Sequence, residues 1–171
     1  MTETKRKRPF WLKLTVEVLI IVLVIVAIRA YMQRDTVSGR APPVSGIALS
    51  GQPVTLAQYE GEPVLVYFWA TWCGVCNLKH GTIERLARDH NVLTVAMQSG
   101  DAAEVRAFMA ERGIDYPVVV DPQGRIAARY GIRGVPASFV VDGAGDIRFT
   151  EIGYTTSWGL RARLWWAGLA G

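Results

Sequence analysis

Two cysteines, Cys73 and Cys76, are the only cysteines in the 171-residue chain, and two residues separate them. Thiols at this spacing can exchange disulfides, hold a soft metal ion or close a static disulfide. The pair follows a continuous apolar run over residues 63–69, which has the length of a strand buried on both faces. An apolar helical stripe then runs from Cys73 to about Asp89. The cysteines are therefore expected where a strand ends and a helix begins.

A cysteine at a helix start is acidified, because unpaired N–H groups and the helix dipole favour its thiolate by about 0.3 to 2 kcal/mol. This lowers a thiol pKa of about 8.5 by roughly 0.2 to 1.5, and a partner thiol lowers it further. Residues three apart on a helical turn have Cα atoms roughly 5 to 6 Å apart, which suits a disulfide. We predict a redox-active dithiol in which Cys73 attacks and Cys76, one turn further in, resolves the mixed disulfide.

Other uses of the pair stay open at this point. The two thiols could be structural, and a static disulfide gains little from so short a loop. A metal site could use Cys73, Cys76 and His80, but structural zinc needs four ligands and the other histidine, His90, lies far along the helix. Copper could recruit Met97 instead. Redox chemistry is preferred, with no metal and no other cofactor.

The charge distribution argues against nucleic acid as a partner. Residues 1–35 hold 7 basic and 3 acidic side chains, and residues 36–171 hold 12 of each. The formal net charge of +4 therefore belongs to the N-terminal piece. A neutral remainder lacks the basic surface that binds phosphates. The composition, 50% hydrophobic and 20% charged, excludes a disordered chain.

The N-terminal piece is typical of a membrane anchor. An apolar stretch from Phe10 to Ile28 spans roughly 28 Å as a helix, close to the hydrocarbon thickness of a bilayer. We predict a basic cytoplasmic tail over residues 1–9, a transmembrane anchor over 10–32, a tether over 33–46 and one folded domain over 47–171. Basic residues are more numerous before the span than after it, so the N-terminus is expected in the cytoplasm and the domain in a bacterial periplasm. A cleaved signal peptide is the alternative.

The remaining patterns predict an α/β fold with a mixed sheet and helices on both faces. The strand, helix and strand over residues 63–97 should form a parallel unit with a right-handed crossover. Asp101 and Glu104 form a capping box that opens a further helix. Further strands are expected over 47–49, 53–56, 117–120, 137–141 and 146–152, and a last helix over 156–167.

The segment from Phe68 to Cys76, followed by Gly134-Val135-Pro136, resembles the thioredoxin superfamily. The chain is similar to its membrane-anchored periplasmic branch, related to the TlpA and cytochrome c maturation thiol-disulfide proteins, and most of all to the suppressor-for-copper-sensitivity D type. The resemblance covers residues 44–168. It implies a thioredoxin-like domain over 47–171 that is a mixed sheet flanked by helices.

The resemblance also implies roles for individual residues. Cys73 becomes the nucleophile, Cys76 the resolving thiol and Pro136 a cis proline that faces the disulfide. Because Pro136 blocks strand pairing, the backbone of Val135 is free to bond an extended substrate segment. Trp72 is expected at the apolar rim of the site. A trans proline that begins a strand, and a Trp72 packed in the core, are the alternatives.

The expected activity is reduction of protein disulfides on the periplasmic side of the bacterial inner membrane. Its partners would be proteins with disulfides or thiols and a membrane electron-donor protein, whose effective concentration rises when both are anchored. A disulfide oxidase or isomerase, and a Cu(I)-binding module without turnover, are the alternatives.

The chain departs from the family pattern at three positions. Tyr67 stands where thioredoxin has a buried Asp, Lys79 where related proteins often have an acid, and Gly81 where they have a helix-kinking proline. Lys79 is expected on a solvated helix face, with stabilisation of a thiolate as the alternative. The sequence therefore assigns no acid or base.

Overall fold

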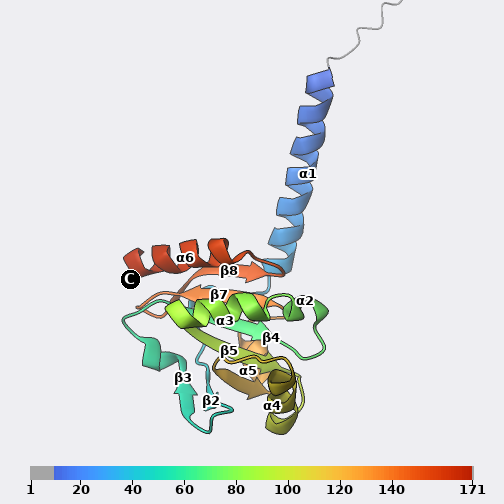
Figure 1. Cartoon of the computed structure of the whole chain (residues 1–171). Coiled ribbons are helices and arrows are strands. Elements are labelled where there is room, and N and C mark those ends of the chain that lie inside the picture. The colour runs from blue at the N-terminus through green and yellow to red at the C-terminus, as the bar shows by residue number, and fades with distance from the viewer. Residues whose placement is uncertain (1–9, 171) are drawn as a thin grey trace, which may run out of the picture. The chain divides into compact units, whose positions relative to one another are not determined.

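The computed structural model describes residues 10–170, which divide into two compact units with the boundary between Arg34 and Asp35. The first unit is helix α1 (Phe10–Gln33), drawn in blue in Figure 1. Within it, Lys13–Gln33 is long and apolar enough to cross a membrane. The basic tail expected over residues 1–9 lies outside the described residues.

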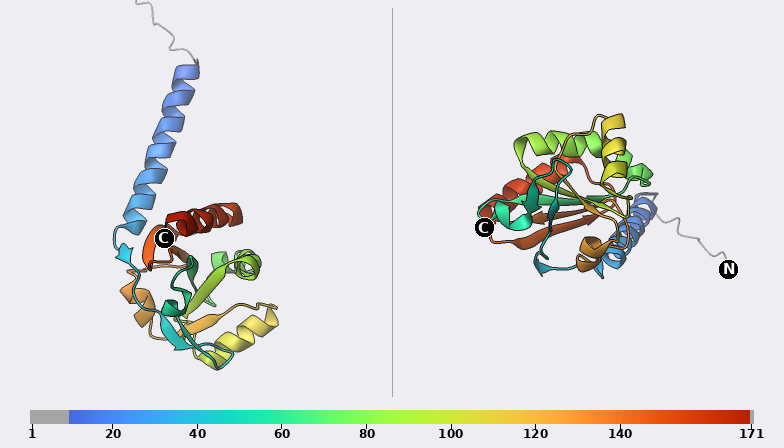
Figure 2. Two further views of the ribbon diagram at one scale, coloured as in Figure 1. Left: turned by 90° about the vertical axis from the view of Figure 1, so that its left-hand side faces the viewer. Right: turned by 90° about the horizontal axis from the view of Figure 1, so that it is seen from below.

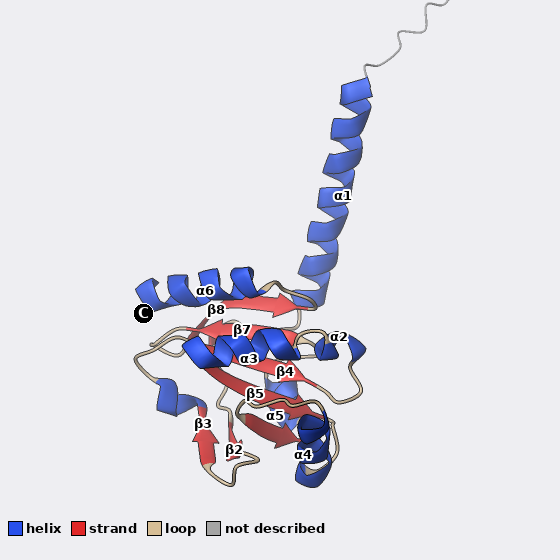
Figure 3. Cartoon of the chain, in the orientation of Figure 1, coloured by secondary structure: helices blue, strands red, loops and turns tan. Residues whose placement is uncertain are grey.

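The second unit is built on a six-stranded mixed sheet in the order β1-β8-β7-β4-β5-β6 (Figure 3). Strands β4, β5 and β6 are parallel to one another. Strand β7 runs antiparallel to β4, β8 to β7 and β1 to β8. The bounds are β1 (Gly39–Arg40), β4 (Val64–Trp69), β5 (Asn91–Met97), β6 (Val118–Asp121), β7 (Ala137–Val141) and β8 (Asp146–Ile152). A separate hairpin pairs β2 (Ser45–Ile47) with β3 (Pro53–Thr55).

Helices cover both faces of this sheet, as the sequence predicts (Figure 2). One face, which we call the cysteine face, packs α3 (His80–Asp89), α4 (Ala102–Glu111) and α6 (Ser157–Ala170) in one cluster with both cysteines. The other, the α5 face, packs α5 (Arg125–Arg129) and the 3₁₀ helix over Leu56–Tyr59. The mixed sheet flanked by helices is confirmed.

Strand β4 is central because all six of its side chains are buried. Successive side chains of a strand point to opposite faces. Leu65, Tyr67 and Trp69 therefore join the cluster of the cysteine face, while Val66 and Phe68 join that of the α5 face. The strand leads directly to the cysteines and fixes where they lie.

The segment expected to be a free tether differs in the structure. Gly39 and Arg40 pair with β8, the Val37 N–H donates to the Tyr130 carbonyl, and Val44 is completely buried. Buried backbone groups must be hydrogen bonded, and these bonds tie the segment to the sheet edge. The compact unit therefore begins at Asp35, twelve residues before the domain boundary expected from sequence.

Candidate active site

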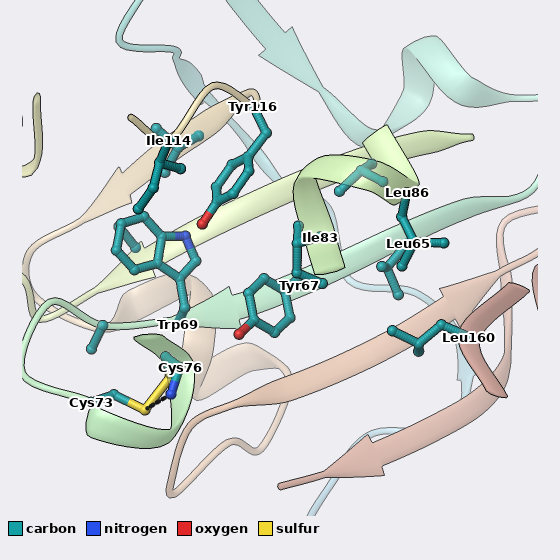
Figure 4. Close-up of a cluster of buried hydrophobic side chains, with 14 of the residues drawn as sticks. Leu65, Tyr67, Trp69, Cys73, Cys76, Ile83, Leu86, Ile114, Tyr116 and Leu160 are labelled. Atoms are coloured by element: carbon teal, nitrogen blue, oxygen red, sulfur yellow. Dashed lines mark hydrogen bonds between the residues drawn. A yellow bond between two sulfur atoms is a disulfide. The ribbon is translucent and has the colours of Figure 1, made fainter. Parts of the chain in front are cut away.

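The two cysteines lie just beyond the carboxyl end of β4 and form a disulfide (Figure 4). Their Cα atoms are 5.2 Å apart, within the range expected from the spacing. Cys73 caps the N-terminus of helix α2 (Gly74–Asn77). Cys76 is completely buried, and Cys73 is 6% exposed. Cys73 is thus the outer sulfur, although it is far less open to solvent than a surface corner suggests.

Two backbone groups, one N–H and one carbonyl, contact the sulfur of Cys73. The Cys76 N–H donates to Cys73 Sγ at 3.1 Å, and the Val135 carbonyl oxygen lies 3.6 Å from the same sulfur. Helix α2 has only 4 residues, so no long helix dipole points at Cys73. The N–H contact is the feature that favours a thiolate at Cys73.

The continuous helix expected from Cys73 to Asp89 is divided into α2 and α3. The Lys79 N–H donates to the Cys76 carbonyl at 2.8 Å, three residues back, whereas the Ile83 N–H donates to the Lys79 carbonyl four residues back. Such a tight turn interrupts the regular helix. Both Cys76 and Lys79 are completely buried.

The Val135–Pro136 peptide bond is cis, as the resemblance implies. Pro136 is buried directly before β7, and its carbonyl accepts the Gly153 N–H at 2.8 Å. Val135 is half-buried, and its carbonyl faces Cys73. A proline at the start of a strand has no N–H for the ladder, which leaves the chain before it outside the sheet.

Exposed apolar side chains flank the two cysteines in the chain. Trp72 is 60% exposed, yet its indole N–H donates to the Gln98 carbonyl at 2.9 Å, which holds the ring in place. Val75 and Leu78 are 46% and 75% exposed. The exposed position of Trp72 matches the rim expected from sequence and excludes the alternative of core packing.

The ligands considered for a metal site do not converge on the cysteines. The ring nitrogens of His80 contact the Tyr116 hydroxyl at 2.6 Å and Asn77 Oδ1 at 3.3 Å. Burial, and then the charge of Arg112, lower the pKa of His80 to about 4. Met97 packs in the cluster of the α5 face, across the sheet. Neither side chain is available as a third ligand.

The family model described as Redoxin matches residues 36–159. The chain belongs to the Redoxin family. This redoxin is 31% identical over 151 residues to a thioredoxin-like protein of Haemophilus influenzae, a match that covers 87% of this chain and 90% of that protein. It is 28% identical to the thiol:disulfide interchange protein DsbE of Pasteurella multocida, over 79% of this chain and 83% of that one.

Solved structures agree with these sequence relatives. A thiol:disulfide interchange protein of Chlorobium tepidum superposes with a TM-score of 0.66 at 25% identity, over 78% of this chain and 99% of that one. The redoxin is thus a thioredoxin-like oxidoreductase related to thiol:disulfide interchange proteins, with a disulfide-bonded Cys73–Cys76 pair.

Lys79 contradicts its expected place on a solvated helix face. Its side chain is completely buried, with Nζ 5.4 Å from the centre of the Tyr67 ring and 6.0 Å from that of Tyr154. Burial lowers the pKa of Lys79 to about 8, and the negative charge of Glu151 partly opposes this change. Sequence reasoning named Lys79 but expected it on the solvated face, although the paired departures at Tyr67 and Lys79 could have indicated its burial.

Proposed function

We propose that this redoxin reduces disulfide bonds of proteins, with Cys73 as the nucleophile and Cys76 as the resolving thiol. One observation carries the assignment of roles: Cys76 is completely buried, whereas Cys73 is 6% exposed and accepts a backbone N–H. A substrate disulfide can reach only the outer sulfur. The thiolate is the reactive form, and the N–H contact favours it at Cys73.

The reaction runs in two exchanges. The Cys73 thiolate attacks one sulfur of the substrate disulfide, a Cys73–substrate bond forms, and the other substrate sulfur leaves as a thiolate that takes a proton from solvent. Cys76 then loses its proton and attacks Cys73 Sγ. The mixed disulfide breaks, the second substrate thiolate leaves, and the Cys73–Cys76 disulfide closes. Two electrons pass from the dithiol to the substrate.

Trp72, Val135 and Pro136 are proposed to bind the substrate. The exposed Trp72 ring offers an apolar surface, and fixed aromatic rings anchor partners at little cost in side-chain entropy. The Val135 backbone, set outside the sheet by Pro136, is suited to pair with an extended segment next to the cysteine that is attacked.

The location is part of the same proposal. Residues 10–32 would cross the bacterial inner membrane once, with residues 1–9 in the cytoplasm and the thioredoxin-like domain in the periplasm. The apolar helix α1 supports a span, and the excess of basic residues before it supports this orientation. A membrane protein that carries electrons outward would return the Cys73–Cys76 disulfide to the dithiol. Within the family, the D type of the suppressor-for-copper-sensitivity proteins is our proposed branch.

A trapping experiment tests the assignment. In the full chain, Cys76→Ser should leave substrate proteins bound to Cys73 through a disulfide that reductant releases, because no resolving thiol is present. The matched control, Cys73→Ser, should trap at least tenfold less, since the remaining thiol is buried. Equal trapping by both variants, or none by either, would contradict the proposal.

The equilibrium potential tests the direction. A reductase should have a potential near that of thioredoxin, about −270 mV, whereas a strong oxidant lies near about −120 mV. The potential is measured by equilibrating the full chain with glutathione buffers. A potential near that of the strong oxidants would mean that the protein oxidises its substrates. Stoichiometric Cu(I) binding without disulfide exchange would favour the alternative of a copper-binding module.

A further inference from the structure

The four buried side-chain polar atoms that lack a hydrogen-bond partner within residues 10–170 include the Tyr67 hydroxyl, the Lys79 amine and the Ser138 hydroxyl, all on the cysteine face. The sheet register brings them together. Tyr67 of β4 pairs with Ser138 of β7, which in turn pairs with Glu151 of β8. Directly paired residues point to the same face, so these side chains form one polar row beneath the helices.

Lys79 reaches this row from the helix side, next to Cys76. The two residues are three apart around one tight turn, and both side chains are completely buried. Residues at this spacing share a helix face, with Cβ atoms about 5 to 6 Å apart. The Lys79 Nζ atom lies over the ring of Tyr67, whose hydroxyl Figure 4 draws on the side facing Cys76. The amine and the resolving sulfur therefore belong to neighbouring buried side chains on one helix face.

A purely structural role does not account for this lysine. A buried charge is costly unless a hydrogen-bonded partner compensates it. The carboxylate whose charge raises the pKa of Lys79 is that of Glu151, and Arg163 already forms an ion pair with it at 2.5 Å. Two aromatic rings at 5.4 and 6.0 Å provide only weak attraction for the ammonium. An apolar side chain would pack here at lower cost.

The resolving step needs a base that removes the proton of Cys76, and the Lys79 amine can act as one. Cys76 reacts as a thiolate, but complete burial disfavours that form and keeps bulk water from its proton. Two buried side chains that can accept a proton follow Cys76 on its helix face, Lys79 and His80. Both ring nitrogens of His80 contact Tyr116 and Asn77, whereas Lys79 Nζ has no hydrogen-bond partner within residues 10–170. The chain thus carries a base beside the thiol that must be deprotonated.

We propose that Lys79 exchanges a proton with Cys76, directly or across one water molecule, in each resolving step. The inference rests on the proposed function and deepens it. In the mixed disulfide, the neutral Lys79 amine takes the Cys76 proton and becomes an ammonium. The Cys76 thiolate attacks Cys73 Sγ, and the substrate leaves as a thiolate. When the disulfide is next reduced, the ammonium returns the proton to Cys76, so Lys79 ends each cycle unchanged.

The acidity of Lys79 suits this exchange. Burial brings its pKa to about 8. A thiol pKa is ordinarily about 8.5, and proton transfer is most effective between groups of similar pKa near the working pH. Charged or titratable groups that face Lys79 include Tyr67 on β4, Glu151 on β8 and Tyr154 after β8. Arg163 on α6 acts through Glu151, and His80 follows Lys79 directly in the chain. Their combined field sets the pH at which the exchange is fastest.

The two exchanges can be timed separately in the reduced full chain with dithiobis-nitrobenzoate. This aromatic disulfide releases one coloured thiolate when Cys73 attacks and a second when Cys76 resolves. Lys79→Met keeps the length and burial of the side chain but removes the base. We expect it to slow the second release at least about tenfold at pH 7, and the first by less than about threefold. The inflection of the second rate near pH 8 should disappear.

Two further variants control the interpretation. Lys79→Arg keeps a positive charge that cannot lose its proton, so its second release should be as slow as that of Lys79→Met. Tyr130→Phe alters a buried phenol on the α5 face and should leave both releases unchanged. The amplitude of the second thiolate release is divided by that of the first, so that both are counted per protein molecule that reacts at Cys73. The result then does not depend on how much of the variant is folded.

Each outcome decides between the claims. A normal second release in Lys79→Met overturns the inference and leaves the proposed function intact. Slowing of both releases by the same factor, or rescue by Lys79→Arg, assigns Lys79 to charge stabilisation and also overturns it. Absence of a first release from the unaltered protein would instead contradict the role of Cys73.

Discussion

The two faces of the sheet differ in how their buried polar groups are hydrogen bonded. On the α5 face, the Tyr130 hydroxyl donates to the Pro42 carbonyl at 2.8 Å, and the Asp121 carboxylate accepts three backbone N–H groups at the start of α5. On the cysteine face, Tyr67, Lys79 and Ser138 hold polar atoms without partners within the described chain. One strand, β4, contributes side chains to both faces.

This difference separates stability from chemistry. Buried polar groups are ordinarily hydrogen bonded, because leaving one unsatisfied costs about 1 to 3 kcal/mol. The buried polar groups described above on the α5 face follow that rule, so we expect this face to contribute mainly to the stability of the domain. The cysteine face departs from it next to the disulfide, where strongly altered pKa values are typical of functional groups. The faces should therefore respond differently to substitution and to pH.

The largest expected effect belongs to the α5 face. Phe68 is completely buried, and its ring centre lies 4.9 Å from that of Tyr130 and 5.9 Å from that of Phe139. Phe68→Ala should lower the free energy of unfolding by about 3 to 5 kcal/mol, since it opens a cavity in a packed cluster. Urea unfolding measures this change. The ratio of the two thiolate release rates should stay within about twofold, and a larger change would contradict the division between the faces.

An intermediate effect is expected from His80 on the cysteine face. The unfolded chain protonates a histidine near pH 6.5, whereas the buried His80 stays neutral until about pH 4. The unfolded state thus binds more protons between these values. Stability should be full above pH 6.5 and should fall towards pH 4, by at most about 1.4 kcal/mol per pH unit.

Urea unfolding at pH 7 and pH 5 measures this dependence. In His80→Phe the loss between the two pH values should shrink, because the variant removes the group that gains a proton on unfolding. An identical loss in both proteins would assign the acid sensitivity to other groups, and the contrast between the faces would lose this support.

The smallest effect compares two buried tyrosines. Tyr130→Phe removes the donor to the Pro42 carbonyl and should cost about 1 to 2 kcal/mol. Tyr67→Phe removes a hydroxyl with no partner within residues 10–170 and should change stability by less than about 0.5 kcal/mol. Thermal unfolding of both variants under the same conditions measures the difference. Equal losses would mean that the Tyr67 hydroxyl is bonded in solution.

Local patterns were sufficient for much of the fold. The apolar run became β4, and the capping box appears as expected, with the Asp101 side chain accepting the Ala103 and Glu104 N–H groups at 2.8 and 3.0 Å. Both signals depend on neighbours in the chain. The cysteine pair was found for the same reason, because two thiols at helical spacing have few other uses.

The features that were missed depend on distant partners. Pairing of Gly39 with Ile147 is not encoded in either short segment, so the sequence predicted a tether over residues 33–46. The buried Lys79 lies against Tyr67 and Tyr154, which are distant from it in the sequence. A lysine at a helical position gives no local sign of such contacts.

Helix α1 ends at Gln33 and the compact unit begins at Asp35, so Arg34 alone joins them. Fully extended, a link of this length reaches only roughly 7 Å. Under the proposed anchoring, so short a link would restrict encounters with an embedded electron donor to lateral diffusion in two dimensions. Substrates free in the aqueous compartment would instead have to reach the membrane.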